Sequence, residues 1–365
     1  MQRPRRLLLA PVAPVAPVAL VLLASAGCVA PSDDPAPGPD PAVASGADTT
    51  VDPVNPDAEA RPAAPAEAAP AAAPLTLPVL TDSGYLVHEV WLGGEGPFWA
   101  VLDTGNQGTI LFASVAGRLG LETAPLGEMG GAGPGSVPVE EATDVAVGMR
   151  GEDGAELVWT EPRVTVLPDA YALPPIEGRR IDAFLGATLL REHLVTIDYP
   201  AGRLTLSPRE GWEPPADALV LAFELTAGFP HLGGTVTPLL RGEPVEPVTG
   251  RFLLDLGSPF PLELEHAEVA ARGLLDGDDP ARRAEGTAMG IDGVPMEILS
   301  GALGAVELGG ADVTGRPGFD RAILPTVAGG GPPIEGLVGS LGSAPFRGGR
   351  LTLDYAGGRA VYLEE

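Results

Sequence analysis

Two aspartates, one in each half of the chain, occupy nearly the same local sequence. Asp103 follows the apolar run Phe98–Leu102 and Asp255 follows Phe252–Leu254, and in both places a glycine stands two residues later. A buried carboxylate is costly unless it is hydrogen-bonded, and glycine lets backbone N–H groups approach it closely. If the two carboxylates met, they would share one proton, and one could act as base on a water while the other protonated a carbonyl. The pattern therefore predicts hydrolysis by an activated water.

Other acids and glycines in the chain have simpler explanations. Asp198 and Asp354 each precede a tyrosine and a turn, so we expect them to cap closing hairpins. The same explanation, a turn aspartate bonded to its own loop, is the alternative for Asp103 and Asp255. The glycine-rich run 130–133 does not lead from a strand into a helix, as a phosphate-binding loop would, and is interpreted as a loop.

The composition of the chain excludes several classes of reaction for these aspartates. The chain has 365 residues, 49 acidic and 22 basic, with a net charge of −27, and every basic residue is an arginine. Chemistry that requires lysine is thereby excluded, for example a Schiff base or a P-loop. One cysteine and four scattered histidines form no metal-ligand motif, so we expect no metal and no other cofactor. The acidity argues against nucleic acid as a partner.

The N-terminal part of the chain resembles a bacterial lipoprotein signal. Arginines in the first six residues precede an apolar run, and small residues stand directly before Cys28. We expect residues 1–27 to be removed and Cys28 to carry a lipid that anchors the protein in the cell envelope, on the outer membrane or the periplasmic face of a two-membrane cell. A membrane-spanning anchor is the alternative, and Sec and Tat export both stay open. Residues 28–75, rich in Ala, Pro and Asp, are expected to form a disordered tether.

Residues 76–365 predict an all-β region made of two similar halves, 76–212 and 213–365. Apolar and β-branched runs alternate with turns, and helical patterns are scarce, chiefly at 113–121 and 263–275. Five short patterns recur in the same order in both halves. In this alignment 83 residues separate Asp103 from Gly186 and 84 separate Asp255 from Gly339. A duplication of one β lobe explains this order better than chance.

These patterns together resemble the aspartic peptidases of the retropepsin and pepsin type. The resemblance covers nearly everything after the tether and implies a double-ψ β-barrel in each lobe, a cleft between the lobes, and cleavage of an extended polypeptide by water held between Asp103 and Asp255. Carried over by position, the active-site loops are Thr104, Gly105, Asn106, Leu256, Gly257 and Ser258. The flap candidates are Gly130, Gly131, Gly133, Gly135, Gly290 and Gly293.

The second loop departs from the family pattern. Where the family has Asp-Thr-Gly or Asp-Ser-Gly, this chain has Leu256, which lacks the hydroxyl that cross-links the two loops in the family. We expect Thr104 to brace the pair from one side only, with Ser258 one residue out of place. Two further hypotheses therefore stand beside the endopeptidase: a catalytically degenerate lipoprotein that binds a peptide or partner in the same cleft, and an accessory lipoprotein whose lobes serve only assembly.

Overall fold

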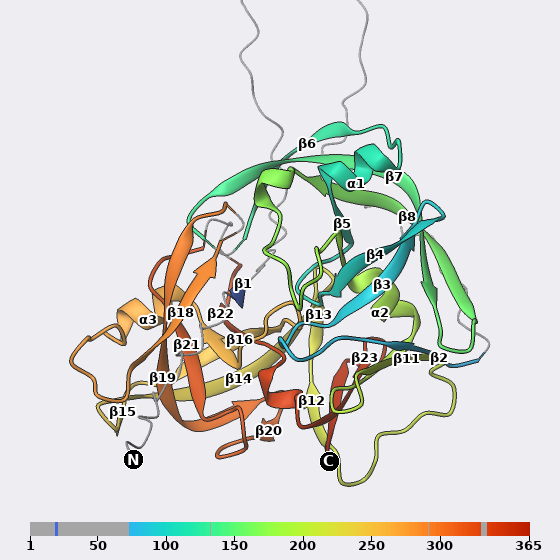
Figure 1. Cartoon of the computed structure of the whole chain (residues 1–365). Coiled ribbons are helices and arrows are strands. Elements are labelled where there is room, and N and C mark those ends of the chain that lie inside the picture. The colour runs from blue at the N-terminus through green and yellow to red at the C-terminus, as the bar shows by residue number, and fades with distance from the viewer. Residues whose placement is uncertain (1–18, 21–72, 132, 291, 330–333) are drawn as a thin grey trace, which may run out of the picture.

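The computed structural model describes residues 19–20, 73–131, 133–290, 292–329 and 334–365. The expectations for the signal, for lipidation at Cys28 and for most of the tether lie outside these residues. No helix in the described part of the chain is long and apolar enough to cross a membrane. The described chain consists mostly of β-strands arranged in two lobes, which confirms the all-β, two-lobed prediction (Figure 1).

Six strands of the N-terminal lobe close into a barrel. Their order around the barrel is β3 (Val87–Leu92), β4 (Glu95–Leu102), β9 (Ala183–Leu185), β5 (Thr109–Phe112), β8 (Glu156–Leu167) and β7 (Ser136–Arg150), and β7 pairs again with β3. Alternating buried and exposed residues along β7 and β8 fit strands that have one face in the core. A seventh strand, β6 (Ala124–Gly130), pairs with the end of β7, so the two strands form a hairpin that projects from the barrel.

The C-terminal lobe repeats this barrel strand for strand. The order is β14 (Phe229–Leu240), β16 (Val248–Leu254), β22 (Leu337–Leu341), β17 (Leu262–Leu264), β21 (Arg321–Pro325) and β19 (Pro295–Leu308), and β19 pairs again with β14. The strand β18 (Arg283–Met289) forms the projecting hairpin with β19, as β6 does with β7. The same order of pairings in both lobes is what a duplication predicts.

Four short strands add to the sheet of the C-terminal lobe. Three of them, β13 (Glu224–Thr226), β15 (Glu243–Pro244) and β20 (Ala311–Asp312), pair with β14 or β19. The fourth, β1 (Ala19–Leu20), comes from the N-terminal part of the chain and pairs in parallel with Ala288 and Met289 of β18. The outer edge of β18 is therefore open to an extended segment of polypeptide.

A third sheet joins the two lobes at their base. Its six strands, in order, are β12 (Leu219–Ala222), β24 (Arg359–Glu364), β23 (Gly349–Asp354), β10 (Leu194–Asp198), β11 (Arg203–Ser207) and β2 (Leu75–Pro78). At its centre the closing strands of the two halves pair antiparallel, and the hydroxyls of Thr196 and Thr352 lie 2.9 Å apart. The pairing relates the lobes by an approximate twofold axis and holds their barrels in a fixed arrangement.

Helices are few and short. They are α1 (Ala113–Arg118), α2 (Ala187–Glu192) and α3 (His266–Ala271), with 3-10 turns at Asp169–Tyr171 and Ala344–Phe346. The expected helix at 113–121 is thus confirmed in its first six residues. The expected helix at 263–275 begins only at His266, because the first part of that segment is strand β17, and the sequence did not indicate α2.

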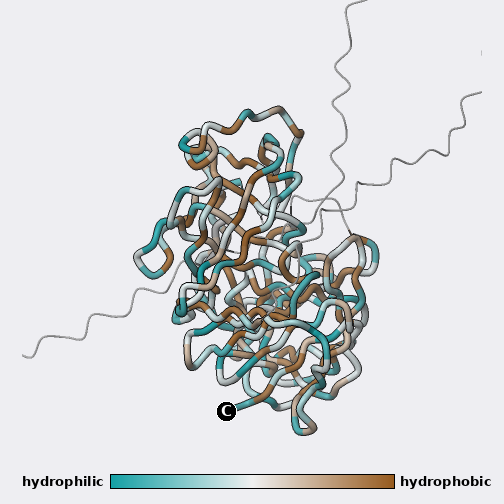
Figure 2. Tube along the Cα trace, turned by 90° about the vertical axis from the view of Figure 1, so that its right-hand side faces the viewer, coloured by the Kyte–Doolittle hydropathy of each residue, from teal (hydrophilic) through white to brown (hydrophobic). Residues whose placement is uncertain are grey.

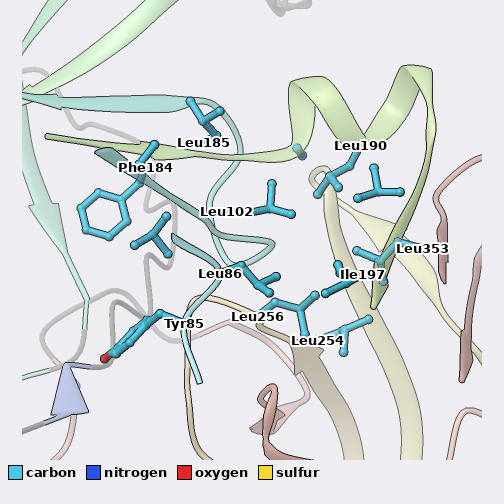
Figure 3. Close-up of a cluster of buried hydrophobic side chains, with 14 of the residues drawn as sticks. Tyr85, Leu86, Leu102, Phe184, Leu185, Leu190, Ile197, Leu254, Leu256 and Leu353 are labelled. Atoms are coloured by element: carbon cyan, nitrogen blue, oxygen red, sulfur yellow. The ribbon is translucent and has the colours of Figure 1, made fainter. Parts of the chain in front are cut away.

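One apolar core runs through both lobes. The largest buried cluster contains residues of both barrels and of the sheet that joins them, among them Leu86, Leu102, Ile197, Leu254 and Leu256 (Figure 3). Hydrophobic stretches pass through the interior of the folded part, while hydrophilic stretches mark several outer loops (Figure 2). Burial of this continuous core, which is the dominant favourable contribution to folding, therefore stabilises the two lobes as a unit.

Candidate active site

The two aspartates lie at equivalent positions, directly after β4 and β16. The backbone N–H of Asp103 donates to the carbonyl of Leu185 at 2.9 Å, and that of Asp255 donates to the carbonyl of Leu341 at 2.9 Å. Each aspartate is thus fixed by the end of the central strand that runs parallel to its own, β9 in one lobe and β22 in the other. The fold positions both residues through backbone groups alone.

Each carboxylate also receives a hydrogen bond from its own loop. Oδ1 of Asp103 accepts from the N–H of Gly105 at 2.8 Å, and Oδ1 of Asp255 accepts from the N–H of Gly257 at 2.9 Å. Both residues are 0 % exposed, and both Oδ2 atoms lack a hydrogen-bond partner among the described residues. Each loop therefore holds one oxygen of its carboxyl group and leaves the other available for chemistry.

The two loops face each other so closely that only glycine fits between them. A Cβ atom added to Gly105 would lie 2.7 Å from Oδ1 of Asp255, and one added to Gly257 would lie 2.3 Å from Oδ1 of Asp103. The structure thus brings Asp103 and Asp255 together as one pair, as the sequence predicted, rather than as two separate turn residues.

The electrostatics of the pair favour retention of a proton. Burial raises the pKa of Asp103 well above its ordinary value, and the nearby charge of Asp255 raises it further. Burial likewise raises the pKa of Asp255, to about 7, against the opposing effect of the hydrogen bonds that it accepts. Two carboxyl groups in one desolvated site cannot both ionise easily, so the pair titrates as a unit that holds one proton over a wide pH range.

Thr104 alone cross-links the two loops. Its hydroxyl donates to the carbonyl of Leu254 at 2.7 Å and accepts from the N–H of Leu256 at 2.7 Å, so it braces the opposite loop on both sides of Asp255. Leu256 makes no such bond and is instead fully buried in the apolar cluster of Figure 3. The expectation of a one-sided brace is confirmed, with hydrophobic packing in place of the second hydroxyl.

Asn106 and Ser258 stabilise their own loops. The side-chain amide of Asn106 donates to the carbonyl of Gly108 at 2.6 Å, and the hydroxyl of Ser258 accepts from the N–H of Phe260 at 3.4 Å. Ser258 therefore does not take over the cross-link that Leu256 lacks.

The structure corrects one correspondence between the halves. The carbonyl of Leu185 accepts from the N–H of Asp103, and Gly186 directly follows Leu185. In the other lobe the carbonyl of Leu341 accepts from the N–H of Asp255, so the residue equivalent to Gly186 is Gly342 and not Gly339. A Cβ atom on Gly186 would lie 2.4 Å from a carbonyl of the first loop, and one on Gly342 would lie 2.3 Å from a carbonyl of the second. The sequence alignment was wrong by three residues here, because the segments between the recurring patterns differ in length. Two apolar residues directly precede Gly339, whereas Ser340 takes the first of these places before Gly342.

The flap candidates lie in two facing turns. Gly130, Gly131, Gly133 and Gly135 lie at the end of the β6–β7 hairpin, and Gly290 and Gly293 lie at the end of the β18–β19 hairpin. The two ends touch, because the carboxylate of Asp292 accepts from the N–H of Gly135 at 2.7 Å. Within its own turn, Asp292 also accepts from the N–H of Val294 at 3.0 Å. The β6–β7 hairpin arches over the molecule toward β18 (Figure 1). The sequence did not single out Asp292.

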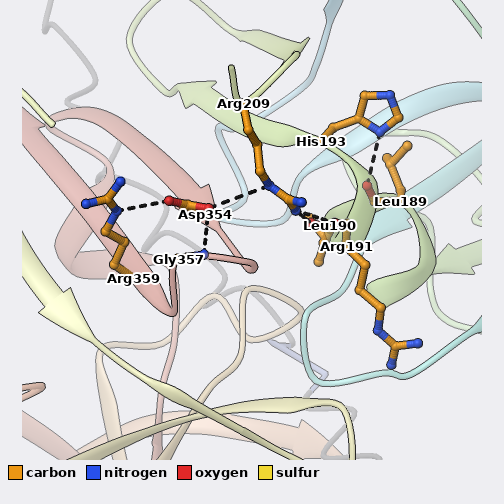
Figure 4. A network of polar contacts seen from close by, with 8 residues as sticks. All are labelled: Leu189, Leu190, Arg191, His193, Arg209, Asp354, Gly357 and Arg359. Carbon is orange, nitrogen blue, oxygen red and sulfur yellow. Dashed lines mark hydrogen bonds and ion pairs between the residues drawn. The ribbon is translucent and has the colours of Figure 1, made fainter. Parts of the chain in front are cut away.

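Asp198 and Asp354 lie away from the pair and cap hairpins, as expected. Asp198 accepts from the N–H of Ala201 at 2.8 Å, and Asp354 accepts from that of Gly357 at 2.9 Å. Asp354 also forms an ion pair with Arg359 at 2.9 Å and lies 3.6 Å from Arg209 (Figure 4).

No cluster of three or more His, Cys, Asp or Glu side chains in the described part of the chain is placed to hold a metal ion.

A cavity of about 550 Å³ opens between the lobes, beside the Asp255 loop. Its wall in the N-terminal lobe includes Tyr85 and the segment 173–177, and its wall in the C-terminal lobe includes the segment 259–261, Ser300 and Ile323. The resemblance to the aspartic peptidases implied a cleft between the lobes, and the position of residues 259–261 directly after the Asp255 loop was a usable clue to one wall of this cavity. A cavity of this size holds several side chains of a peptide or a small ligand.

Comparison with known proteins adds little to this geometry. No protein-family model matches the chain, and no curated protein matches it either. Among solved structures, the chain is similar to the crystal structure of Basic 7S globulin from soybean, with 12% sequence identity and a TM-score of 0.45 over 80% of this chain and 94% of that one.

Proposed function

We propose that this protein is an aspartic endopeptidase of the retropepsin and pepsin type, with a double-ψ β-barrel in each lobe. The observation that carries the proposal is the buried pair of Asp103 and Asp255, in which each carboxyl group is held by a glycine N–H and has one oxygen without a partner. A carboxyl pair with raised pKa values is suited to share one proton at weakly acid to neutral pH.

The pair would hydrolyse a peptide bond in two steps, each with two proton transfers. A water between the carboxyl groups gives a proton to the ionised one and attacks the carbonyl carbon, while the protonated one gives its proton to the carbonyl oxygen. The tetrahedral diol then breaks its C–N bond, with one hydroxyl proton returning to a carboxylate and another proton passing from the pair to the leaving nitrogen. One carboxyl group is again protonated and the other ionised, so the pair is ready for a new water.

The two hairpins would enclose the substrate. Their ends are joined through Asp292 and Gly135, and the outer edge of β18 pairs with an extended segment, β1. An extended polypeptide is the ligand that such an edge recognises, through main-chain hydrogen bonds. Hairpins that close over the bound chain would exclude bulk water and strengthen the electrostatic interactions of the pair.

Single substitutions in the pair test this proposal. Full-length wild type, Asp103→Asn and Asp255→Asn are incubated with a mixed peptide library from pH 3 to pH 9, and products are detected by mass spectrometry. We expect cleavage by wild type that falls toward the alkaline end of this range, where the pair loses its last proton, and a loss of at least about a thousandfold in each variant. Cleavage that survives either substitution in a folded protein contradicts the proposal.

Leu256 favours a second candidate, a peptide-binding protein with the same cleft and a degenerate site. The family hydroxyl is absent there, and its place is filled by packing. Leu256→Thr distinguishes the two candidates: a large rise in cleavage identifies a weakened peptidase, whereas peptide binding without cleavage by either protein identifies a binding protein. Circular dichroism verifies that the variant is folded.

We further propose that the protein is exported and lipid-anchored in the cell envelope through Cys28, which would place the lobes beyond a long tether and leave polypeptides of that compartment as substrates. The support is the sequence alone: arginines, an apolar run and small residues before the single cysteine. Metabolic labelling with a radioactive fatty acid tests it. Wild type should carry the label and Cys28→Ala should not, and equal labelling of both contradicts the proposal.

A further inference from the structure

A row of side chains on one face of the C-terminal sheet leads from the Asp255 loop toward the interlobe cavity. Glu263 in β17 is paired with Ser340 on one side and with Ile323 on the other, and Ile323 is paired in turn with Ser300. Neighbouring residues in a strand point to opposite faces, and Leu262 belongs to the main core. Glu263 therefore shares its face with Ile323 and Ser300, which line the cavity.

Glu263 lacks the partners that a buried acid normally has. It is 8 % exposed, its Oε2 has no hydrogen-bond partner among the described residues, and the hydroxyl of the adjacent Ser340 has none either. The buried acid of the other lobe, Glu161, accepts hydrogen bonds from Thr109, Trp159 and Thr188. An unpaired buried carboxyl group destabilises the fold, so its position on the sheet face that leads to the cavity suits a ligand that supplies the partner.

The charges around Glu263 indicate which partner is missing. Burial and, to a smaller extent, the negative charges of Glu265 and Asp255 together raise its pKa to about 8, with no cation acting against them. Arg321 on the cavity wall is already engaged, since it donates to Glu285 at 2.8 Å and to Ser300 at 2.5 Å. A positive charge brought in by a ligand would restore the ionised form of Glu263 and pair with it.

The N-terminal lobe has apolar residues at the equivalent places. Ile110 is paired with Phe184 across β5 and β9, as Glu263 is paired with Ser340 across β17 and β22. Phe184 directly precedes Leu185, whose carbonyl accepts from the N–H of Asp103. Ser340 likewise precedes Leu341, whose carbonyl accepts from the N–H of Asp255. The residues that flank the carboxyl pair are therefore apolar in one lobe and polar in the other.

We propose that Glu263 and Ser340 determine specificity by binding a lysine or arginine side chain of the substrate. The ammonium or guanidinium group donates to the Glu263 carboxylate and to the Ser340 hydroxyl. This inference rests on the proposed endopeptidase function and names its substrate class, extended polypeptide with a basic residue near the cleaved bond.

The test compares lysine with norleucine, which keeps the aliphatic chain and lacks the charge. A decapeptide library with each position fixed in turn as lysine, arginine or norleucine is offered to wild type, Glu263→Gln and Glu213→Gln. Glu213 is an exposed acid in the segment between β11 and β12, so Glu213→Gln makes the same exchange of side chains outside the hairpins and the cavity. We expect wild type to prefer lysine or arginine at one position by about tenfold or more in kcat/KM. Glu263→Gln should reduce this ratio to near one, and Glu213→Gln should leave it unchanged.

Binding separates this inference from the function on which it rests. The affinities of the same peptides, labelled with fluorescein, are measured by anisotropy with all three proteins. A lysine preference in affinity that Glu263→Gln removes supports the recognition site even if no peptide is cleaved, in which case only the proposed catalysis fails. The absence of any basic preference in both assays, or a preference that Glu263→Gln leaves intact, overturns the inference.

Discussion

The two lobes share a backbone and differ in the side chains around their aspartates. Both barrels have the same strand order, and both aspartates are held by the same two kinds of bond, from the backbone of a central strand and from a loop glycine. The next residue is Thr104 in one lobe and Leu256 in the other. The two halves therefore share the backbone interactions that orient the carboxyl groups. They differ in the side-chain contacts that connect the two loops.

The difference between Thr104 and Leu256 shows that one cross-link can hold two loops. A single hydroxyl both donates and accepts, and it contacts the backbone on each side of Asp255. The leucine occupies the symmetry-related place with apolar contacts in the core between the lobes. The hydrogen bonds of Thr104 and the apolar packing of Leu256 thus hold the aspartate pair from opposite sides, and substitutions at the two loops can separate their effects.

The largest effect is expected from adding a methyl group between the carboxyl groups. In Gly257→Ala the new Cβ would lie 2.3 Å from Oδ1 of Asp103, closer than any real contact allows, so the pair must separate. We expect kcat/KM to fall by about a thousandfold or more, because positioning of the reacting groups supplies much of the rate. Gly105→Ala, with its Cβ 2.7 Å from Oδ1 of Asp255, should behave alike.

Gly108→Ala is the matched control for these variants. Gly108 lies in the loop of Asp103, but the nearest atom to an added Cβ is a backbone oxygen 4.0 Å away, so the methyl group fits without displacing the pair. Its activity should stay within about threefold of wild type. Activity in Gly257→Ala that equals that of this control would show that the carboxyl groups need not be in contact.

Removal of the single cross-link is expected to have the next largest effect. Thr104→Val keeps the shape of the side chain but leaves the carbonyl of Leu254 and the N–H of Leu256 without partners. Each buried group without a partner destabilises by about 1–3 kcal/mol, so we expect a loss of roughly 2–6 kcal/mol in the free energy of unfolding, measured with urea. Thr104→Ser retains the hydroxyl and should lose much less. Equal losses in both variants would assign the role of Thr104 to its methyl group.

The sequence predicted the parts of the site that depend on local pattern. An apolar run, an aspartate and a glycine recur within a few residues, so Asp103 and Asp255 could be named in advance. The flap candidates were named because the two glycine-rich turns match the position of the flap in the aspartic peptidases that the chain resembles. The all-β lobes follow from apolar and β-branched runs separated by turns. These predictions needed no knowledge of which strands become neighbours.

What the sequence could not predict depends on contacts between distant segments. The contact of Asp292 with Gly135 joins two hairpins that each look complete by themselves. Glu263 was assigned to a helical stretch, because a three-residue strand is too short to show a period, and its partner Ser340 belongs to the segment that was misaligned. Length differences between the halves displaced the alignment where the tertiary register, rather than the local pattern, decides which residues correspond.

Glu263 should make the free energy of unfolding depend on pH, whereas Ile110, its counterpart in the other lobe, does not titrate. Its pKa of about 8 in the folded chain lies above the ordinary value of 4.5, so the folded state favours the protonated form. The stability from this group is therefore complete below about pH 4.5 and is lost as pH rises toward 8. We expect the free energy of unfolding of wild type to fall between pH 5 and pH 8 by about 2–3 kcal/mol more than that of Glu263→Gln. Parallel urea titrations that give the same pH slope for both proteins would contradict this assignment.

The smallest effect is expected where the lobes touch through their hairpins. The carboxylate of Asp292 is partly exposed and receives one bond across the interface, from the N–H of Gly135, so its removal in Asp292→Ala loosens the turns without disturbing the core. A charge-assisted bond at such a site contributes about 1 kcal/mol, which predicts a rise of several-fold in KM with little change in kcat. Asp292→Asn keeps an acceptor oxygen, so its KM should lie between those of wild type and Asp292→Ala. Hydrogen exchange of the peptide around Gly135 should quicken in Asp292→Ala, and unchanged exchange would mean that the β6–β7 hairpin is held by its own strands alone.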